Sequence, residues 1–139
     1  MFKIIVNICA VPLFAILAAG VVHAKDLPTV PILAPILLQV PAGASAEDVK
    51  KAVRKAFFDK DWEVREIAPG HLQGKHTKSG KDKMHVAVVD VRFDAKSVRI
   101  GYKDSQELNY NKESGVIHKT YNRWVKNLEK NIRANLGSY

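Results

Sequence analysis

The hydrophobic pattern is clearest in the last long helix that the sequence predicts, at residues 116–136. Its apolar side chains recur at helical spacing within an arc of about 120°, and they are Ile117, Tyr121, Trp124, Val125, Leu128, Ile132 and Leu136. A second row, centred about 155° from the first, is basic and is called here the basic stripe: Lys119, Arg123, Lys126, Lys130 and Arg133. One face of this helix is therefore expected in a core, and the opposite face carries a row of cations.

A second amphipathic helix is predicted to begin after Ser45 and to end near Asp59. The segment Ser45-Ala46-Glu47-Asp48 resembles a capping box in which Asp48 replaces the usual Glu or Gln. Apolar residues then follow at the spacing of a buried helical row: Val49, Ala52, Val53, Ala56 and Phe57. The opposite side of this helix is basic, with Lys50, Lys51, Arg54 and Lys55.

Four strand-like runs lie between the two helices, at residues 62–67, 72–78, 83–93 and 98–103. Short polar turns join them, which is typical of an antiparallel meander. Pairing Lys78 with Lys83 and Phe93 with Val98 collects the apolar side chains on one face of the sheet: Leu72, Ala87, Val89, Val91, Phe93, Val98, Ile100 and Tyr102.

An apolar sheet face and two helices with apolar rows are best buried against one another. We therefore predict a single α+β domain over residues 45–139. It is a four-stranded antiparallel meander with two helices on one face, in the order α-β-β-β-β-α.

The first 24 residues are predicted to be a secretory signal peptide. Lys3 precedes an apolar run from Ile4 to Val22, and Val22-His23-Ala24 supplies small residues before a cleavage site at Lys25. An uncleaved membrane anchor is the alternative. Cys9, the only cysteine, stands inside this run, so residues 25–139 contain neither a disulfide nor a thiol nucleophile. The expected location is periplasmic or secreted.

Residues 25–44 form an apolar arm that is rich in proline. Its prolines forbid a helix and disfavour a central strand, and they are Pro28, Pro31, Pro35 and Pro41. Two interpretations stay open: an extended arm that packs on its own domain or on a partner, and a mobile tether. Residues 36–40 could form a short edge strand.

Several motifs between Ser45 and Leu136 resemble a known group of proteins. They are Asp61-Trp62 with Pro69-Gly70, His85-x-Ala-x-Val-x-Val-x-Phe-Asp94, Val98-x-Ile-x-Tyr-Lys-Asp-Ser105, Leu108-x-Tyr110 and Ile117-His-x-x-Tyr-Asn-x-Trp-Val-x-Asn-Leu128. The group consists of small, uncharacterised secreted or lipoprotein-like proteins of Gram-negative bacteria. Its members often carry a lipobox cysteine at the end of the signal, which this sequence lacks. The resemblance implies a location in the cell envelope and no particular activity.

The charge of the chain suggests an anionic partner. Lys and Arg number 22 against 14 Asp and Glu, a net charge of +8, and the basic stripe concentrates part of it on one helix. Outside the cytoplasm the matching anions are lipid phosphates, lipopolysaccharide, acidic envelope polymers or an acidic patch on a protein. The plainer interpretation is a solvated helix face. Nucleic acid is not expected, because the chain is predicted to be secreted and has no row of base-stacking aromatics.

A second candidate surface lies on the far face of the third predicted strand. Met84, Val86 and Val88 point away from both helices in the predicted register. Three apolar residues in a row on a central strand suggest a covered face. The proline-rich arm, a second copy of the chain or a protein partner could cover it, and the last two would make the protein a small assembly subunit.

Metal binding has little support in the sequence. His76 and His85 are cross-strand neighbours in the predicted register and could share a metal, with Glu63 or His118 as a third ligand. Two ligands do not make a selective site, so no metal or cofactor is expected.

Hydrolysis has as little support. Asp104, Ser105 and His118 are the residue types of a catalytic triad, but no nucleophile elbow surrounds the serine. A turn in which Asp and Ser bond their own backbone is the favoured interpretation. The chain is therefore predicted to be a non-catalytic envelope protein that binds an anionic surface or a protein partner. A weak metal-binding protein or a hydrolase is the alternative.

Overall fold

The computed structural model describes residues 28–139, so the predicted signal peptide lies outside the described residues. The helices are α1 (Ala46–Asp59) and α2 (Lys119–Leu136). The strands are β1 (Thr29–Pro31), β2 (Ile36–Gln39), β3 (Trp62–Ala68), β4 (His71–Ser79), β5 (Met84–Phe93), β6 (Ser97–Gln106) and β7 (Val116–His118).

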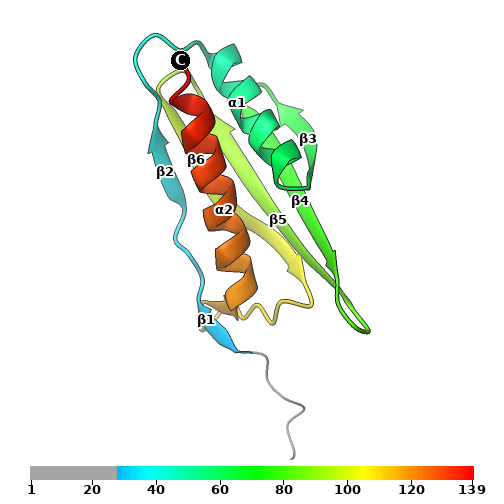
Figure 1. Cartoon of the computed structure of the whole chain (residues 1–139). Coiled ribbons are helices and arrows are strands. Elements are labelled where there is room, and N and C mark those ends of the chain that lie inside the picture. The colour runs from blue at the N-terminus through cyan, green and yellow to red at the C-terminus, as the bar shows by residue number, and fades with distance from the viewer. Residues whose placement is uncertain (1–27) are drawn as a thin grey trace, which may run out of the picture.

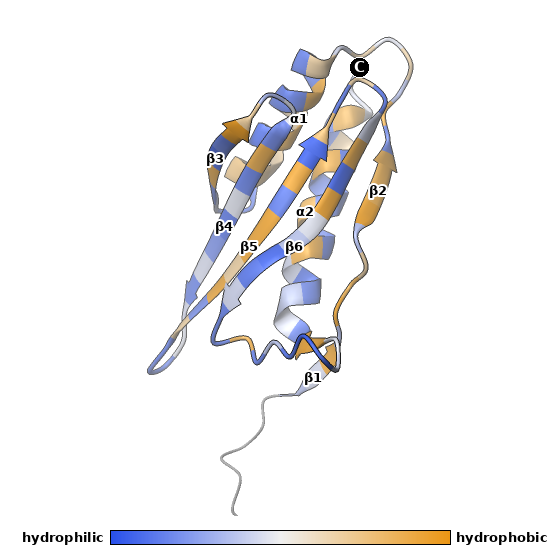
Figure 2. Ribbon diagram, turned by 180° about the vertical axis from the view of Figure 1, so that it is seen from behind, coloured by the Kyte–Doolittle hydropathy of each residue, from blue (hydrophilic) through white to orange (hydrophobic). Residues whose placement is uncertain are grey.

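One antiparallel sheet organises the molecule. Its five strands lie in the order β2-β6-β5-β4-β3, and β1 and β7 pair as a separate two-stranded sheet. Both helices lie side by side on the same face of the larger sheet (Figure 1). The view from behind in Figure 2 shows the other face of this sheet, which neither helix covers. The domain therefore has two layers, one of helices and one of strands.

The predicted four-stranded meander in the order α-β-β-β-β-α is wrong. Strands β3 to β6 do follow one another as antiparallel neighbours, but the larger sheet has a fifth strand and the chain forms a second sheet. The additional strands come from the proline-rich arm: β2 pairs with β6, and β1 pairs with β7. Pro35 and Pro41 flank β2 without interrupting it, and an edge position suits a strand that is bounded by prolines. The arm therefore packs on its own domain.

The core lies between the two layers. It takes the predicted apolar rows of both helices, the helix-facing side of the sheet, and Leu38 from the arm, which is 1% exposed. The predicted capping box of α1 is confirmed: the Asp48 N–H donates to the Ser45 Oγ at 3.1 Å, and the Ser45 N–H donates to the Asp48 carboxylate at 2.9 Å. Each helix therefore presents the side that its sequence pattern predicts, but the last helix begins at Lys119 and not at residue 116, so Ile117 of the predicted row lies in β7.

One of the two predicted hairpin registers is correct. Phe93 pairs with Val98, and the β5–β6 pairing continues as predicted until a bulge beyond Val89. In the β4–β5 hairpin, however, Lys78 pairs with His85 and not with Lys83. The turn is centred one residue later than predicted and is closed by the Gly80 N–H, which donates to the Lys83 carbonyl at 2.7 Å. A shift of two residues leaves every side chain on its predicted face.

Candidate functional site

Helix α2 is held firmly along its length. At its start the Thr120 N–H donates to the His118 Nδ1 at 3.2 Å, which makes His118 the N-cap residue. In its first half the Asn122 side chain donates to the Pro31 carbonyl and accepts from the Leu33 N–H, so it binds the arm. Near its end the Asn135 side chain donates to the Ala52 carbonyl of α1 at 3.0 Å. These bonds, with the buried row, fix the orientation of the opposite face.

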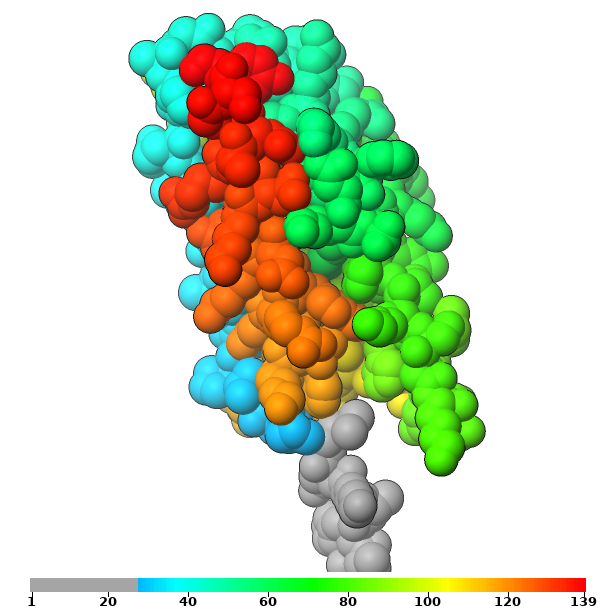
Figure 3. All heavy atoms as spheres, in the orientation of Figure 1, coloured from blue at the N-terminus to red at the C-terminus, as the bar shows by residue number. Residues whose placement is uncertain are grey.

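The basic stripe lies on that opposite face, and all five of its side chains are exposed. Arg133 forms an ion pair with Glu129 at 2.8 Å within α2. The other four stripe residues have no ion-pair partner among residues 28–139. They span about 16 Å along the helix. This side of α2 faces the viewer in the space-filling view (Figure 3).

Helix α1 adds less positive charge than its sequence suggests. Lys50 and Arg54 both pair with Glu66 of β3, at 2.8 Å and 3.1 Å, and Lys55 pairs with Asp59. The hydrogen bond from Lys50 is the main cause that lowers the pKa of the Glu66 carboxyl; desolvation opposes it, and the hydrogen bond from Arg54 adds to the lowering. Within the described chain, Lys51 alone among these four helix cations has no ion pair.

Phe58, which the sequence analysis did not single out, is the most conspicuous side chain of the helix layer. It is 81% exposed, whereas its neighbour Phe57 is fully buried. At 100° per residue, Phe58 lies about 170° from the centre of the buried row of α1. The same calculation could have found it in the sequence, because it places an aromatic side chain in the middle of the basic side of the helix.

The start of α2 borders a pocket with a positive character. A volume of about 240 Å³ is lined by Lys78, Ser79, Gly80, His85, Leu108, His118, Thr120, Arg123 and Trp124. Burial, and then the charges of His85, Lys119 and Arg123, lower the pKa of the His118 imidazole. Burial is therefore the main reason why the His118 imidazole resists protonation, and the cations at the end of the basic stripe act in the same direction.

The predicted partner face on β5 is not a continuous apolar surface. Met84 is 52% exposed, but Val86 is only 6% exposed and Val88 is half-buried. The arm does not cover this face, because β2 lies at the edge of the sheet beside β6. Assembly through these three residues therefore stays a prediction with less support than the basic stripe.

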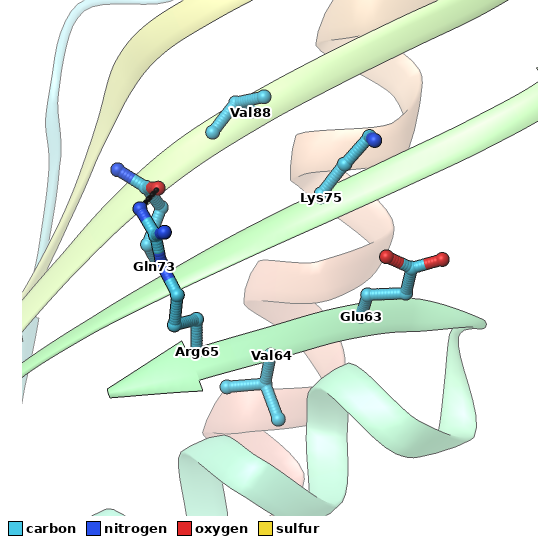
Figure 4. A pocket seen from close by; sticks show the side chains of 6 residues that line it. All are labelled: Glu63, Val64, Arg65, Gln73, Lys75 and Val88. Atoms are coloured by element: carbon cyan, nitrogen blue, oxygen red, sulfur yellow. Dashed lines mark hydrogen bonds between the residues drawn. The ribbon is translucent and has the colours of Figure 1, made fainter. Parts of the chain in front are cut away.

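Charged and polar groups lie beside Val88 on the uncovered sheet face. A hollow of about 330 Å³ is lined by Glu63, Val64, Arg65, Gln73, Lys75 and Val88. In Figure 4 the Arg65 guanidinium reaches across to Gln73, to which it donates at 3.1 Å. The same view shows Lys75 and Glu63 on neighbouring strands at the side of this hollow. Opposite charges are mixed here, unlike on the outward side of α2.

The histidine pair proposed from the sequence does not form. Because of the register shift, His76 pairs with Ala87. Its ring lies between Trp62 and Trp124, with centroid distances of 5.2 Å and 4.5 Å. His85 bonds the Glu107 carbonyl through its Nδ1 at 2.8 Å. Residues 28–139 contain no group of three His, Cys, Asp or Glu side chains that could hold a metal ion.

The residues considered for hydrolysis make local contacts. The Ser105 N–H donates to the Asp104 carboxylate at 2.8 Å, but both residues lie within β6, next to its bulge, so the predicted turn at this position is wrong. The Ser105 hydroxyl bonds the Tyr102 hydroxyl at 2.9 Å. His118 accepts from the Thr120 backbone and, within the described chain, makes no hydrogen bond to Ser105. These contacts belong to the bulged end of β6 and to the N-cap of α2.

Comparison with known proteins does not assign a family. No family model matches the chain, and no curated protein matches it. Among solved structures it is similar to the vertebrate conserved region (VCR) of human METTL16, with 11% sequence identity and a TM-score of 0.43. The match covers 74% of this chain and 98% of that one. Similarity at this level says nothing about activity. In residues 28–139, neither helix combines the length and the apolar character that crossing a membrane would require.

Proposed function

We propose that this protein is a non-catalytic envelope protein that binds an anionic surface through the basic stripe of α2. The observation that carries the proposal is that all five stripe side chains are exposed on one firmly held helix. Four of them have no carboxylate partner in the described chain. An extended anion therefore meets cations that are already aligned, so little ordering of the protein accompanies binding.

The envelope location rests on the predicted signal peptide at residues 1–24 and on the resemblance to secreted proteins of Gram-negative bacteria. It places the stripe among the phosphate groups of lipids and lipopolysaccharide and among acidic polymers. Exposed charge contacts are individually weak and are screened by salt. Binding should therefore depend on several cations together and weaken steeply as ionic strength rises.

A soluble polyanion tests this proposal. We expect residues 25–139 to bind dextran sulfate at low ionic strength, measured by calorimetry, and to release it as sodium chloride is added. Each stripe cation contributes about 1 kcal/mol near an anionic surface, or about fivefold in affinity. The double variant Lys126→Gln/Lys130→Gln removes two of them and should therefore bind about 25-fold more weakly.

The matched control is Lys75→Gln/Lys103→Gln. Both of these lysines are exposed, lack an ion pair in the described chain, and lie on the strands of the uncovered sheet face. The control makes the same change in net charge and should bind almost as the unmodified chain does. If the two double variants lost the same affinity for dextran sulfate, or if the unmodified chain did not bind it at all, the stripe would be a solvated helix face.

A further inference from the structure

Phe58 is the most exposed large apolar side chain of the described residues, at 81%. Single exposed apolar residues are common on protein surfaces and need no explanation by themselves. The position of Phe58 is what distinguishes it. Lys51 and Lys55 stand seven and three residues before it on the same side of α1.

Phe58 and the basic stripe point in the same direction. The buried rows of α1 and α2 pack on one face of one sheet, so the sides opposite those rows both face outward from the helix layer (Figures 1 and 3). Phe58 and the stripe each lie on the side opposite the buried row of their helix. One surface of the molecule therefore presents an aromatic ring together with a row of cations.

The two helices also bring Phe58 next to the middle of the stripe. They run antiparallel (Figure 1), and the Asn135 side chain of α2 bonds the Ala52 carbonyl of α1. Phe58 follows Ala52 by six residues, so it is level with about residue 129 of α2. Lys126 and Lys130 lie on either side of that level.

A dissolved polyanion can neutralise the lysines, but it offers the phenyl ring no apolar surroundings. A bilayer offers anions to the lysines and apolar surroundings to the ring, because anionic headgroups and acyl chains lie within a few ångströms of each other at its surface. Surface-bound proteins gain affinity from buried apolar area and from attraction to anionic lipids at once. The pairing of charge and aromatic side chain on one surface fits a lipid bilayer better than a polymer.

We infer that the anionic surface bound by this protein is a lipid bilayer, which the helix layer contacts with the basic stripe at the headgroups and Phe58 inserted among the acyl chains. This inference rests on the proposed function of the stripe and adds the identity of the surface. It needs no change in the fold, because the ring and the four cations that have no ion pair within residues 28–139 already face outward.

The test compares lipid with polymer. The chain used is residues 25–139, because the buried core lies wholly between Leu38 and Leu136 and the apolar residues 4–22 would bind lipid by themselves. Cosedimentation or calorimetry measures its binding to vesicles of phosphatidylglycerol and phosphatidylcholine, to vesicles of phosphatidylcholine alone, and to dextran sulfate.

We expect Phe58→Ser to weaken binding to the anionic vesicles about tenfold or more and to leave dextran sulfate binding unchanged. Leu37→Ser, at a side chain 59% exposed on the sheet edge, should change neither.

A second measurement reports insertion directly. In Phe58→Trp the new indole should be quenched by brominated lipid, above the background of Trp62 and Trp124, which are both buried. If Phe58→Ser binds anionic vesicles as tightly as the unmodified chain, and the Phe58→Trp indole is not quenched, the inference is wrong. The proposed function then still stands on dextran sulfate binding. If neither vesicles nor dextran sulfate bind, the proposed function fails as well.

Discussion

Gly74 of β4 lies directly beneath the ring of Phe57 of α1. A Cβ at position 74 would come within 2.6 Å of the Phe57 Cζ and closer still to Cε1. The ring has little room to move, because it is fully buried and packs beside Trp62 at a centroid distance of 5.9 Å. The close approach of the helix to the sheet therefore depends on a residue without a side chain.

Gly74→Ala should destabilise the domain by about 1–3 kcal/mol, because the added methyl group displaces a packed ring. Urea unfolding followed by tryptophan fluorescence measures the change. Gly101→Ala is the control: it lies in β6, and a Cβ there meets nothing within 4 Å. The control should change the free energy of unfolding by no more than about 0.5 kcal/mol. Similar losses at both positions would contradict the role given to the Phe57 contact.

Leu38→Ala tests whether the arm belongs to the folded domain. Leu38 is buried in the core, so its truncation should cost about 2–5 kcal/mol. Leu37→Ala removes the neighbouring exposed side chain and should stay within about 0.5 kcal/mol. The same unfolding measurement serves for both. If Leu38→Ala had no effect, the arm would be a tether after all.

The fold was predictable from sequence where its determinants are local. The buried rows of both helices, the capping box at Ser45 and the β5–β6 register all follow from short-range patterns. The edge strand expected at residues 36–40 is present as β2, but its pairing partner was not predictable, because Ile36–Gln39 is too short to show periodicity and β6 lies far along the chain. The turn around Gly80 carries no residue pair that selects a single register, and the pairing shifted there by two residues.

The candidate site, too, was predictable from sequence only where its determinants are local. Exposure of the basic stripe follows directly from helical geometry, and the structure places all five side chains on the outward side of α2. The pairing of Lys50 and Arg54 with Glu66 was not foreseen, because it joins two elements whose relative position depends on the complete fold. Phe58 was overlooked although periodicity alone places it opposite the buried row.

His118 should make the stability of the domain depend on pH. Burial, and then the charges of His85, Lys119 and Arg123, lower its pKa below the usual 6.5. The unfolded chain therefore takes up a proton at this residue first, so the contribution of His118 to stability falls as pH drops through 6.5. Unfolding free energies measured at pH 7.5 and pH 5.5 should show a larger loss for the unmodified chain than for His118→Asn.

Asparagine is the informative replacement because its side-chain oxygen can still accept the Thr120 N–H as an N-cap. His118→Ala removes that acceptor and should lose about 1 kcal/mol at pH 7.5. If His118→Asn and the unmodified chain lost the same stability on acidification, His118 would not be the group that titrates.

Glu66→Gln should strengthen binding to anionic vesicles about two- to fivefold. It frees Lys50 and Arg54 from their ion pairs and removes one negative charge beside the helix layer. Exposed ion pairs of this kind contribute little to stability, so the domain stays folded. Glu63→Gln makes the same change in charge on the uncovered sheet face and should have little effect in the vesicle assay. Equal gains would indicate a response to net charge alone.

The pairing of β2 with β6 has a consequence for the order of folding. Ile36 and Ile100 are neighbours in the sheet, yet α1 and strands β3 to β5 lie between them in the chain. Closing so long a loop costs more entropy than forming any of the hairpins from β3 to β6. We therefore expect β2 to join the sheet late during folding and to be among the first strands to exchange its amide hydrogens. A chain emerging from a ribosome or a membrane channel keeps its apolar arm unpaired until β6 has followed it.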